Sequence, residues 1–233
     1  ATRWFDELAA FEDEIGDVES SGTLTVAAEA PVLRYQLPRF VDAFAREQRH
    51  AQLRLLSRRP LEIIELVRRN EIDLGIIDRR PLPSEVNFHP WRTFQAFVLI
   101  PRGHPLARRG PPALDSILNE ATLLRYPQVV GEIDERDQNR LREGLERLGL
   151  PYNVVLEVGN IETVKYYVAR GHGIAVIPGL CLSDEDAAIF HLIEIPEELE
   201  GETSYGVILR EGKHISSALK SFLGLLDVPS LSG

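Results

Sequence analysis

Residues 60–77 read Pro60-Leu-Glu-Ile-Ile-Glu-Leu-Val-Arg-Arg-Asn-Glu-Ile-Asp-Leu-Gly-Ile-Ile77, and residues 160–178 repeat the pattern as Asn160-Ile-Glu-Thr-Val-Lys-Tyr-Tyr-Val-Ala-Arg-Gly-His-Gly-Ile-Ala-Val-Ile-Pro178. In each stretch, apolar residues recur at helical spacing, and a polar turn then leads to a short aliphatic run. Such a run is typical of a buried strand in a parallel sheet. Two helix–turn–strand units predict two α/β lobes, and the cleft between two such lobes is a ligand-binding architecture.

The sequence around these two units alternates between helical and strand patterns. Besides the second quoted unit, we expect strands at residues 23–28, 52–56, 73–77, 86–89, 94–100, 122–125, 153–157 and 205–209, and helices at residues 35–47, 61–69, 113–118, 135–148 and 215–226. The strand–helix–strand order over residues 23–77 predicts a parallel sheet with right-handed crossovers. Two extended segments follow Pro81 and Pro83, so we expect the chain to enter a second lobe there and to return near residues 191–196. The expected fold class is therefore α/β, with lobe I formed by residues 22–93 and 195–229 and lobe II by residues 94–194.

Five apolar residues near the N-terminus are separated by alternating spacings of four and three, and these are Trp4, Leu8, Phe11, Ile15 and Val18. This spacing is the 3.5-residue repeat of paired helices. Residues 1–21 are thus expected to be the end of a longer dimerisation helix, or an amphipathic helix that packs on its own domain.

Composition and charge exclude several classes of protein. The 233 residues carry a net charge of -10, which argues against direct binding of a phosphate backbone by this segment. No run approaches the ~18 apolar residues of a membrane span, and the N-terminus lacks a signal-peptide pattern. The single cysteine, Cys181, fits a reducing compartment, so we expect a cytoplasmic protein with no membrane partner. Because the chain contains no methionine, we also expect it to be part of a longer product.

Several short motifs occur in a characteristic order along the chain. They are Thr23-Leu-Thr-Val26, Leu37-Pro38 with Phe44, Asn70-Glu-Ile-Asp-Leu-Gly-Ile-Ile77, Val98-Leu-Ile-Pro101 with His104-Pro-Leu106, and Val168-Ala-Arg-Gly-His-Gly-Ile-Ala-Val-Ile-Pro178. In order and spacing, the chain from Gly22 onward resembles the effector-binding domain of LysR-type transcriptional regulators.

This resemblance implies a type 2 periplasmic-binding-protein-like fold, with two Rossmann-like lobes and an interlobe cleft that senses a small molecule. Residues 1–21 would be the end of the linker helix, and the protein would be a homodimer, which in this family often pairs into a tetramer. DNA would be bound only through an N-terminal winged helix-turn-helix domain that this chain does not contain.

Candidate effector-binding residues lie where strands are expected to end. In open parallel sheets, ligands bind beyond the carboxyl ends of the strands, where helix N-termini favour anions. The candidates are Ala30, Pro31 and Val32 in a first corner, Ser57 and Arg58 in a second corner, Gly159, Asn160 and Ile161 in a third corner, and Asp78 and Arg125 at two further strand ends. Alternatively, Ser57 and Asn160 are ordinary helix caps, Arg58 is a solvated side chain, and Asp78 belongs to a local turn or salt bridge.

The first corner differs from that of the relatives it most resembles. The stretch Leu33-Arg-Tyr-Gln-Leu-Pro38 is similar to the branch of the family that responds to sulfur-related anions, in which threonines line this corner. Here Ala28-Glu-Ala-Pro-Val32 replaces the hydroxyls with a carboxylate and apolar groups. The effector is therefore expected to be more apolar, cationic, or absent.

Enzymatic sites are not predicted. The six histidines show no i, i+4 pair, so the spacing of metal ligands is absent, and Cys181 lacks the signature of a nucleophile. We expect a sensor without catalytic residues, metal or cofactor. A periplasmic solute-binding protein with the same two-lobe plan is the alternative, and a small-molecule enzyme of the same fold is a third hypothesis.

Overall fold

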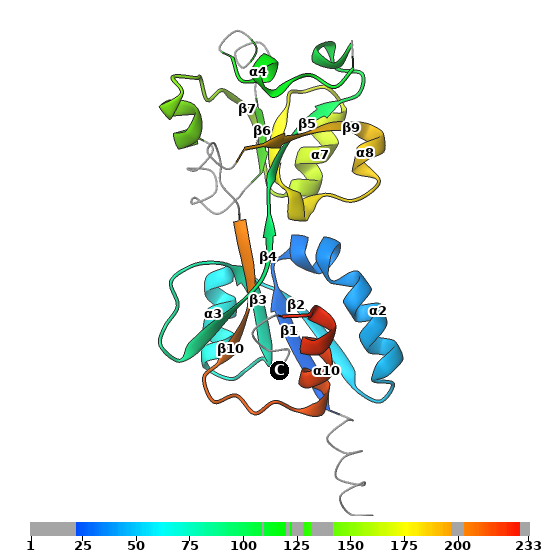
Figure 1. The fold of residues 1–233 in the computed structure, drawn as a ribbon, viewed down its shortest axis with the longest axis vertical. Coiled ribbons are helices and arrows are strands. Elements are labelled where there is room, and N and C mark those ends of the chain that lie inside the picture. The colour runs from blue at the N-terminus through cyan, green and yellow to red at the C-terminus, as the bar shows by residue number, and fades with distance from the viewer. Residues whose placement is uncertain are drawn as a thin grey trace, which may run out of the picture. The chain divides into compact units, whose positions relative to one another are not determined.

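The computed structural model describes residues 22–108, 110–119, 122, 128–131, 142–196 and 203–228. They form two compact units (Figure 1). The first unit runs to Arg92 and resumes at Ser204, and the second spans Thr93–Thr203. Ile195, which the sequence pattern assigned to lobe I, lies instead in the second unit. The reason is that Ile195 pairs with Ala96 as the last residue of a strand in that unit.

The first unit contains a five-stranded sheet with the strand order β2-β1-β3-β10-β4. These strands are β1 (Thr23–Ala28), β2 (Gln52–Ser57), β3 (Leu74–Asp78), β4 (Val86–Phe94) and β10 (Thr203–Arg210). β1 pairs in parallel with β2 and β3, whereas β10 pairs antiparallel with β3. The predicted parallel pairing is thus confirmed, and β1, β2 and β3 begin and end within one residue of the expected bounds. β4 extends to Phe94, five residues beyond the expected end at residue 89, and β10 begins two residues before the expected start at residue 205.

Helices cover both faces of this sheet. α3 (Pro60–Arg68) lies on one face, and α2 (Pro38–Glu47) and α10 (Ser217–Leu226) lie on the other (Figure 1). Ile63, Ile64 and Val67 of α3 pack with Ala27 and Ile77 of the sheet. These residues recur at helical spacing, which is why the pattern could be recognised in the sequence.

The helix expected at residues 35–47 is divided into two parts. A π-helical turn, η1 (Val32–Gln36), precedes α2, and the backbone N of Leu37 donates to the carbonyl of Val32 at 3.1 Å. Pro38 has no N–H, and its ring excludes the carbonyl of a preceding α-helical turn. The regular α-helix therefore begins at Pro38, and the preceding turn is wider.

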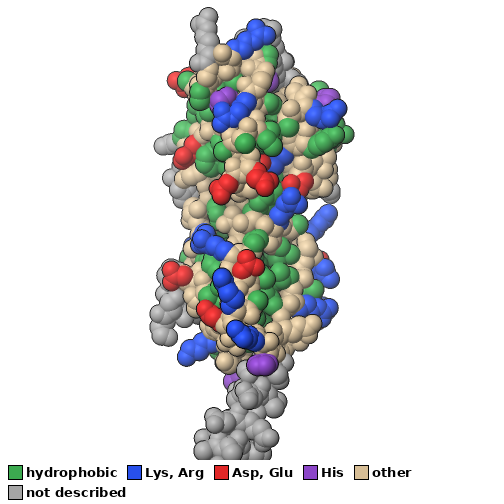
Figure 2. Space-filling view, turned by 90° about the vertical axis from the view of Figure 1, so that its right-hand side faces the viewer, with side chains coloured by type: hydrophobic (Ala, Val, Ile, Leu, Met, Phe, Trp, Pro, Cys, Tyr) green, Lys and Arg blue, Asp and Glu red, His purple; other side chains and the backbone are tan. Residues whose placement is uncertain are grey.

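Charges of both signs are interspersed on the visible face of the first unit (Figure 2). On α3, Nη2 of Arg68 lies 2.9 Å from Oε2 of Glu65. The guanidinium lowers the pKa of the Glu65 carboxyl by hydrogen bonding to its charged form.

The second unit contains an antiparallel sheet in the order β8-β5-β9 and a parallel pair, β6 and β7. The strands are β5 (Ala96–Pro101), β6 (Gln128–Gly131), β7 (Val154–Val158), β8 (Ala175–Pro178) and β9 (Phe190–Ile195), and the helices are η2 (Pro105–Ala107), α4 (Leu114–Ile117), α7 (Ile161–Ala169), η3 (Gly179–Cys181) and α8 (Asp186–Ile189). The backbone N of Val129 in β6 donates to the carbonyl of Ile174 at 2.9 Å, which links the pair to the residue before β8.

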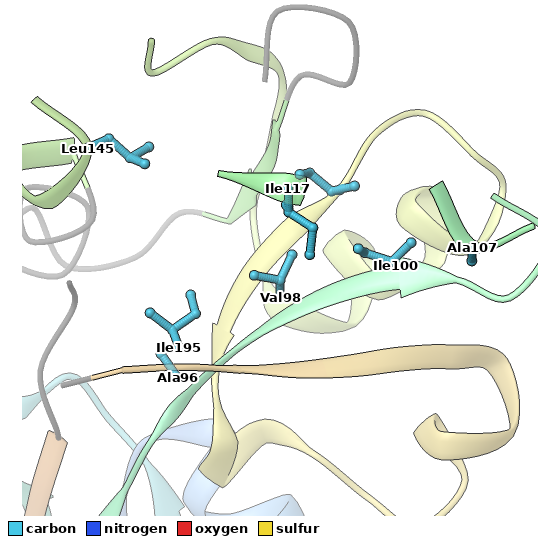
Figure 3. Close-up of a cluster of buried hydrophobic side chains, with 8 residues drawn as sticks. Ala96, Val98, Ile100, Ala107, Ile117, Leu145 and Ile195 are labelled. Carbon is cyan, nitrogen blue, oxygen red and sulfur yellow. The ribbon is translucent and has the colours of Figure 1, made fainter. Parts of the chain in front are cut away.

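A hydrophobic cluster fills the second unit (Figure 3). Ala96, Val98 and Ile100 alternate along β5 and therefore share one face of the strand. Ile117 of α4 and Ile195 of β9 pack into the same cluster. The core thus gathers residues from segments about 100 positions apart in the chain.

Two predicted elements differ from the structure or lie partly outside it. The strand expected at residues 122–125 is wrong at Thr122, which is helical, and the strand of this region is β6. The Asn119 side chain accepts a hydrogen bond from the backbone N of Thr122 at 3.0 Å, as a residue before a helix does. A short apolar run does not distinguish helix from strand by its pattern. Residues 142–147 are helical as expected, whereas residues 135–141 lie outside the described residues.

His104 is a buried imidazole at the start of η2. Its Nδ1 accepts a hydrogen bond from the backbone N of Leu106 at 3.3 Å, so this nitrogen is unprotonated. Burial lowers the pKa of His104 below its ordinary value of 6.5 because desolvation disfavours the charged ring. The neutral ring therefore contributes stability that is fully present above pH 6.5 and is lost as the pH falls through the lowered pKa.

We expect His104→Asn to flatten the pH dependence of the thermal midpoint, because asparagine keeps an acceptor at the position of Nδ1 but does not titrate. Thermal unfolding between about pH 7.5 and about pH 5 measures this slope. Part of the slope should remain, since burial also lowers the pKa of His89. An unchanged slope in His104→Asn would show that His104 does not contribute.

Candidate functional site

The carboxyl ends of β1, β2 and β3 meet at one edge of the first unit's sheet. Ala28 at the end of β1 is paired with Ser57 of β2 and with Ile76 of β3. The backbone N of Arg58 donates to the carbonyl of Ala28 at 3.1 Å. This edge brings together six of the candidate effector-binding residues, namely Ala30, Pro31, Val32, Ser57, Arg58 and Asp78.

The first corner is mainly apolar and leads directly into helical backbone. Ala28 and Val32 are buried, Pro31 is half-buried and Ala30 is exposed. The backbone N of Leu33 donates to the carbonyl of Glu29 at 3.1 Å, which closes the first helical turn after β1. A ligand at this corner would meet backbone groups and aliphatic carbons in place of hydroxyl groups.

The second corner is the start of α3. The N-cap is Arg59, whose side chain forms no capping hydrogen bond, and Pro60 follows it. Ser57 is therefore not the cap of this helix, and its side chain is exposed. The first N–H groups of an α-helix lie beyond the reach of its own carbonyls, and such groups favour an anion or a polar acceptor.

Arg58 is held by neighbouring groups of its own segment. Its Nε lies 2.8 Å from Oε1 of Glu62 on α3, and its Nη1 donates to the carbonyl of Ser57 at 2.7 Å. The positive charge is thus compensated by a carboxylate four residues ahead. The Arg58–Glu62 spacing could have revealed this pair in the sequence.

Asp78 lies at the end of β3 with 8% of its surface exposed. Its Oδ1 accepts a hydrogen bond from Nε of Arg80 at 2.9 Å, and both side chains are largely buried. The local salt bridge, one of the two hypotheses for Asp78, is therefore present. Arg80 was not among the expected site residues.

The third corner lies in the second unit, where β7 leads into α7. Asn160 is the N-cap of α7, and its Oδ1 accepts from the backbone N of Thr163 at 2.9 Å and from Oγ1 of Thr163 at 3.0 Å. The cap hypothesis for Asn160 is thus confirmed, with Gly159 and Ile161 on either side. Arg125 and the five dimerisation residues Trp4, Leu8, Phe11, Ile15 and Val18 lie outside the described residues.

Asn160→Ala is expected to lower the free energy of unfolding by about 1 kcal/mol, because the N–H of Thr163 loses its acceptor. Denaturant unfolding measures the loss. Asn160→Asp is the control, since it keeps the acceptor and should retain the stability. Equal losses in the two variants would contradict the capping role.

A buried ion pair in the second unit was not predicted from the sequence. Nζ of Lys165 on α7 lies 2.7 Å from Oδ2 of Asp186, and the exposed fractions of the two residues are 7% and 6%. The Lys165 ammonium also donates to the carbonyl of Cys181. The only local signal was a lysine adjacent to the apolar positions Val164 and Val168 of α7.

Two further properties follow from the described residues. Over the described ranges, no three His, Cys, Asp or Glu residues are grouped so that they could hold a metal ion. Within the same ranges, no helix has the length and hydropathy needed to cross a membrane.

Comparison with known proteins identifies the family. The family model "LysR substrate binding domain" matches residues 18–228. This chain belongs to that family. The fold class expected from the sequence, two Rossmann-like units of the type 2 periplasmic-binding-protein kind, is confirmed.

Curated proteins with similar sequences are named as transcriptional regulators. The HTH-type transcriptional regulator cbl of Escherichia coli K12 is 31% identical over 161 residues, which are 68% of this chain and 49% of that protein. The HTH-type transcriptional regulator CysB of Burkholderia cenocepacia is 25% identical over 215 residues, which are 92% of this chain and 66% of that protein. The chain thus spans between about half and two thirds of the length of these curated relatives.

Solved structures share the fold. The cofactor-binding domain of the Cbl transcriptional regulator superposes with a TM-score of 0.72 at 26% identity and covers 89% of each chain. The Synechocystis CcmR regulatory domain, solved in complex with 2-PG, superposes with a TM-score of 0.70 at 24% identity and covers 88% of this chain and 95% of that chain.

Proposed function

We propose that this chain is the effector-sensing regulatory domain of a LysR-type transcriptional regulator. It binds a small molecule and alters transcription through a helix-turn-helix module that lies outside this sequence. The observation that carries the proposal is the family match over residues 18–228, together with relatives whose names are those of HTH-type transcriptional regulators. These names do not support the solute-carrier alternative.

The proposed effector-binding residues are those of the three corners and the two strand ends. They are Ala30, Pro31, Val32, Ser57, Arg58, Asp78, Arg125, Gly159, Asn160 and Ile161. For the residues in the first unit, the proposal is supported by their position at the carboxyl ends of the parallel strands. Because Arg58 and Asp78 are each paired locally, we propose that a ligand at this edge contacts the Ser57 hydroxyl and the start of α3.

Sensing requires that the effector bind one conformation of the protein more tightly than another. A ligand with equal affinity for two states shifts neither population. The proposed domain therefore converts the difference in effector affinity into a change of conformation, and no chemical step is needed. We propose accordingly that it acts as a cytoplasmic sensor without catalytic residues or a cofactor.

A second copy of the chain is the proposed protein partner, with residues 1–21 contributing the heptad residues. Two sheet edges offer additional apolar surface. Leu55 on the edge strand β2 is 37% exposed, and Val155 on β7 is 55% exposed. Sedimentation of the purified chain tests whether it forms a dimer. Sedimentation of the full regulator tests whether it forms a tetramer.

A ligand screen by thermal shift tests the sensing function. The probes are inorganic sulfate, benzoate, shikimate, 2-PG and a set of small organic acids and amines. A ligand at 100 times its dissociation constant stabilises a protein by about 2.7 kcal/mol, which corresponds to roughly 5–10 °C for a chain of this size. A chain that no probe stabilises would count against the sensing function.

Ser57→Ala tests whether the edge of the first unit belongs to the site. We expect the ligand-induced shift to fall by at least half, while the midpoint of the free protein stays within about 2 °C, because Ser57 is exposed and caps no helix. Ser84→Ala is the matched control. Ser84 is also an exposed serine, and it lies next to Glu85. The carbonyl of Glu85 accepts a hydrogen bond from the backbone N of Glu211, which follows the end of β10 that lies away from Asp78. Equal ligand-induced shifts in the two variants would remove Ser57 from the site.

A further inference from the structure

Lys165 connects α7 to a segment that lies later in the chain. It is located one helical turn after Ile161, about 6 Å along the helix axis at ~1.5 Å per residue. Its Nζ donates to Oδ2 of Asp186 at 2.7 Å and to the carbonyl of Cys181. Both acceptors belong to residues 179–189, which comprise η3, a short loop and α8.

The acceptor Asp186 is itself fixed by its own segment. Oδ2 of Asp186 also accepts from the backbone N of Ser183 at 2.7 Å and from Oγ of Ser183 at 3.1 Å. A buried ammonium is unfavourable unless its donors are satisfied, so the Lys165 side chain is restricted to this geometry. The bonds are directional, and they therefore hold α7 at one position along its axis relative to residues 179–189.

We infer that Lys165 is a positioning residue for the third corner. By holding α7 against Asp186, it places the Asn160 cap and the first turn of the helix at the end of β7. The inference rests on the proposed function for the role of this corner in effector recognition. Lys165 acts through the helix backbone, whereas Asn160 and its neighbours present the groups that a ligand would meet.

Arg102 provides a matched control because it holds the same segment from a different element. Its side chain is exposed, and its Nε and Nη2 donate to the carbonyl of Ala187 at 3.1 and 2.6 Å. Its backbone N also donates to the carbonyl of Ile189 at 3.0 Å. Loss of the Arg102 side chain thus loosens α8 from the end of β5 and leaves the contact between α7 and Asp186 in place.

The test is amide hydrogen exchange at Thr163 and Val164, whose backbone N–H groups donate to Oδ1 and the carbonyl of Asn160. The variants are Lys165→Met, Lys165→Met with Asp186→Leu, and Arg102→Ala. We expect exchange at these two amides to be about tenfold faster in Lys165→Met and unchanged within about twofold in Arg102→Ala. In the double variant, the apolar pair should restore part of the global stability, while exchange stays at least about fivefold faster.

The double variant separates positioning from a purely structural role. If exchange at Thr163 and Val164 returns to the wild-type rate when stability is restored, the positioning role is overturned. If Lys165→Met does not fold, Asp186→Asn replaces it, since it removes the charge and keeps the shape, and the same two amides must again exchange faster. No effector is needed for this measurement, so a failed ligand screen and a failed positioning test are distinguishable.

Discussion

Lys165→Met is expected to destabilise the second unit by about 3–5 kcal/mol, because the Asp186 carboxylate then remains buried without its cation. The measurement is equilibrium unfolding in denaturant. Asp186→Leu added to Lys165→Met should recover a large part of the loss, since buried ion pairs are often replaced by apolar pairs at little cost.

The control for this prediction is an exposed ion pair in the same unit. Nε of Arg142 lies 2.9 Å from Oε1 of Glu146, and the two side chains are 59% and 57% exposed. Arg142→Met should change the free energy of unfolding by less than about 0.5 kcal/mol. Comparable losses in Lys165→Met and Arg142→Met would show that burial of the Lys165 pair does not determine its contribution.

Phe44→Ala is expected to destabilise the first unit by about 3–5 kcal/mol. Phe44 on α2 is 1% exposed, and its ring meets that of Phe222 on α10 edge to face, with centroids 5.6 Å apart. The substitution removes this contact and leaves a cavity where the two helices pack together. Denaturant unfolding measures the loss.

Two variants bracket the Phe44 prediction. Phe44→Leu keeps most of the apolar volume and should lose much less stability than Phe44→Ala. Leu61→Ala removes a side chain that is 71% exposed on α3, and it should change the free energy of unfolding by less than about 0.5 kcal/mol. A loss in Phe44→Ala no larger than that in Leu61→Ala would contradict the packing argument.

The predicted elements were most accurate where their signal is local. β1 matched the expected residues 23–28, and α3 was displaced by one residue, because alternation and helical spacing are read from neighbouring positions. The Asn160 cap was likewise anticipated from an asparagine at the start of an apolar helix. The strand expected at residues 122–125 was wrong at Thr122, because a short apolar run carries no periodicity that separates helix from strand.

The candidate site was predicted in part. The order of parallel strands places the ends of β1, β2 and β3 together, so Ser57 and Asp78 could be assigned to one edge before their contacts were known. Their charge environment was not predicted. Arg58 is paired with Glu62 and Asp78 with Arg80, and these pairings decide which groups of the edge are available to a ligand.

The sequence by itself determined the α/β class, the family, and the helices and strands whose apolar residues repeat at i, i+2 or i, i+3 and i+4. Only the tertiary structure decided that Lys165 pairs with Asp186, that Ile195 belongs to the second unit, and that the indole N–H of Trp91 donates to the carbonyl of Leu226 at 2.8 Å. The physical reason is distance along the chain. Periodicity and capping act between residues a few positions apart. In contrast, Lys165 and Asp186 are 21 positions apart, Ile195 and its strand partner Ala96 are 99 apart, and Trp91 and Leu226 are 135 apart. These residues meet only when the sheets and helices have packed.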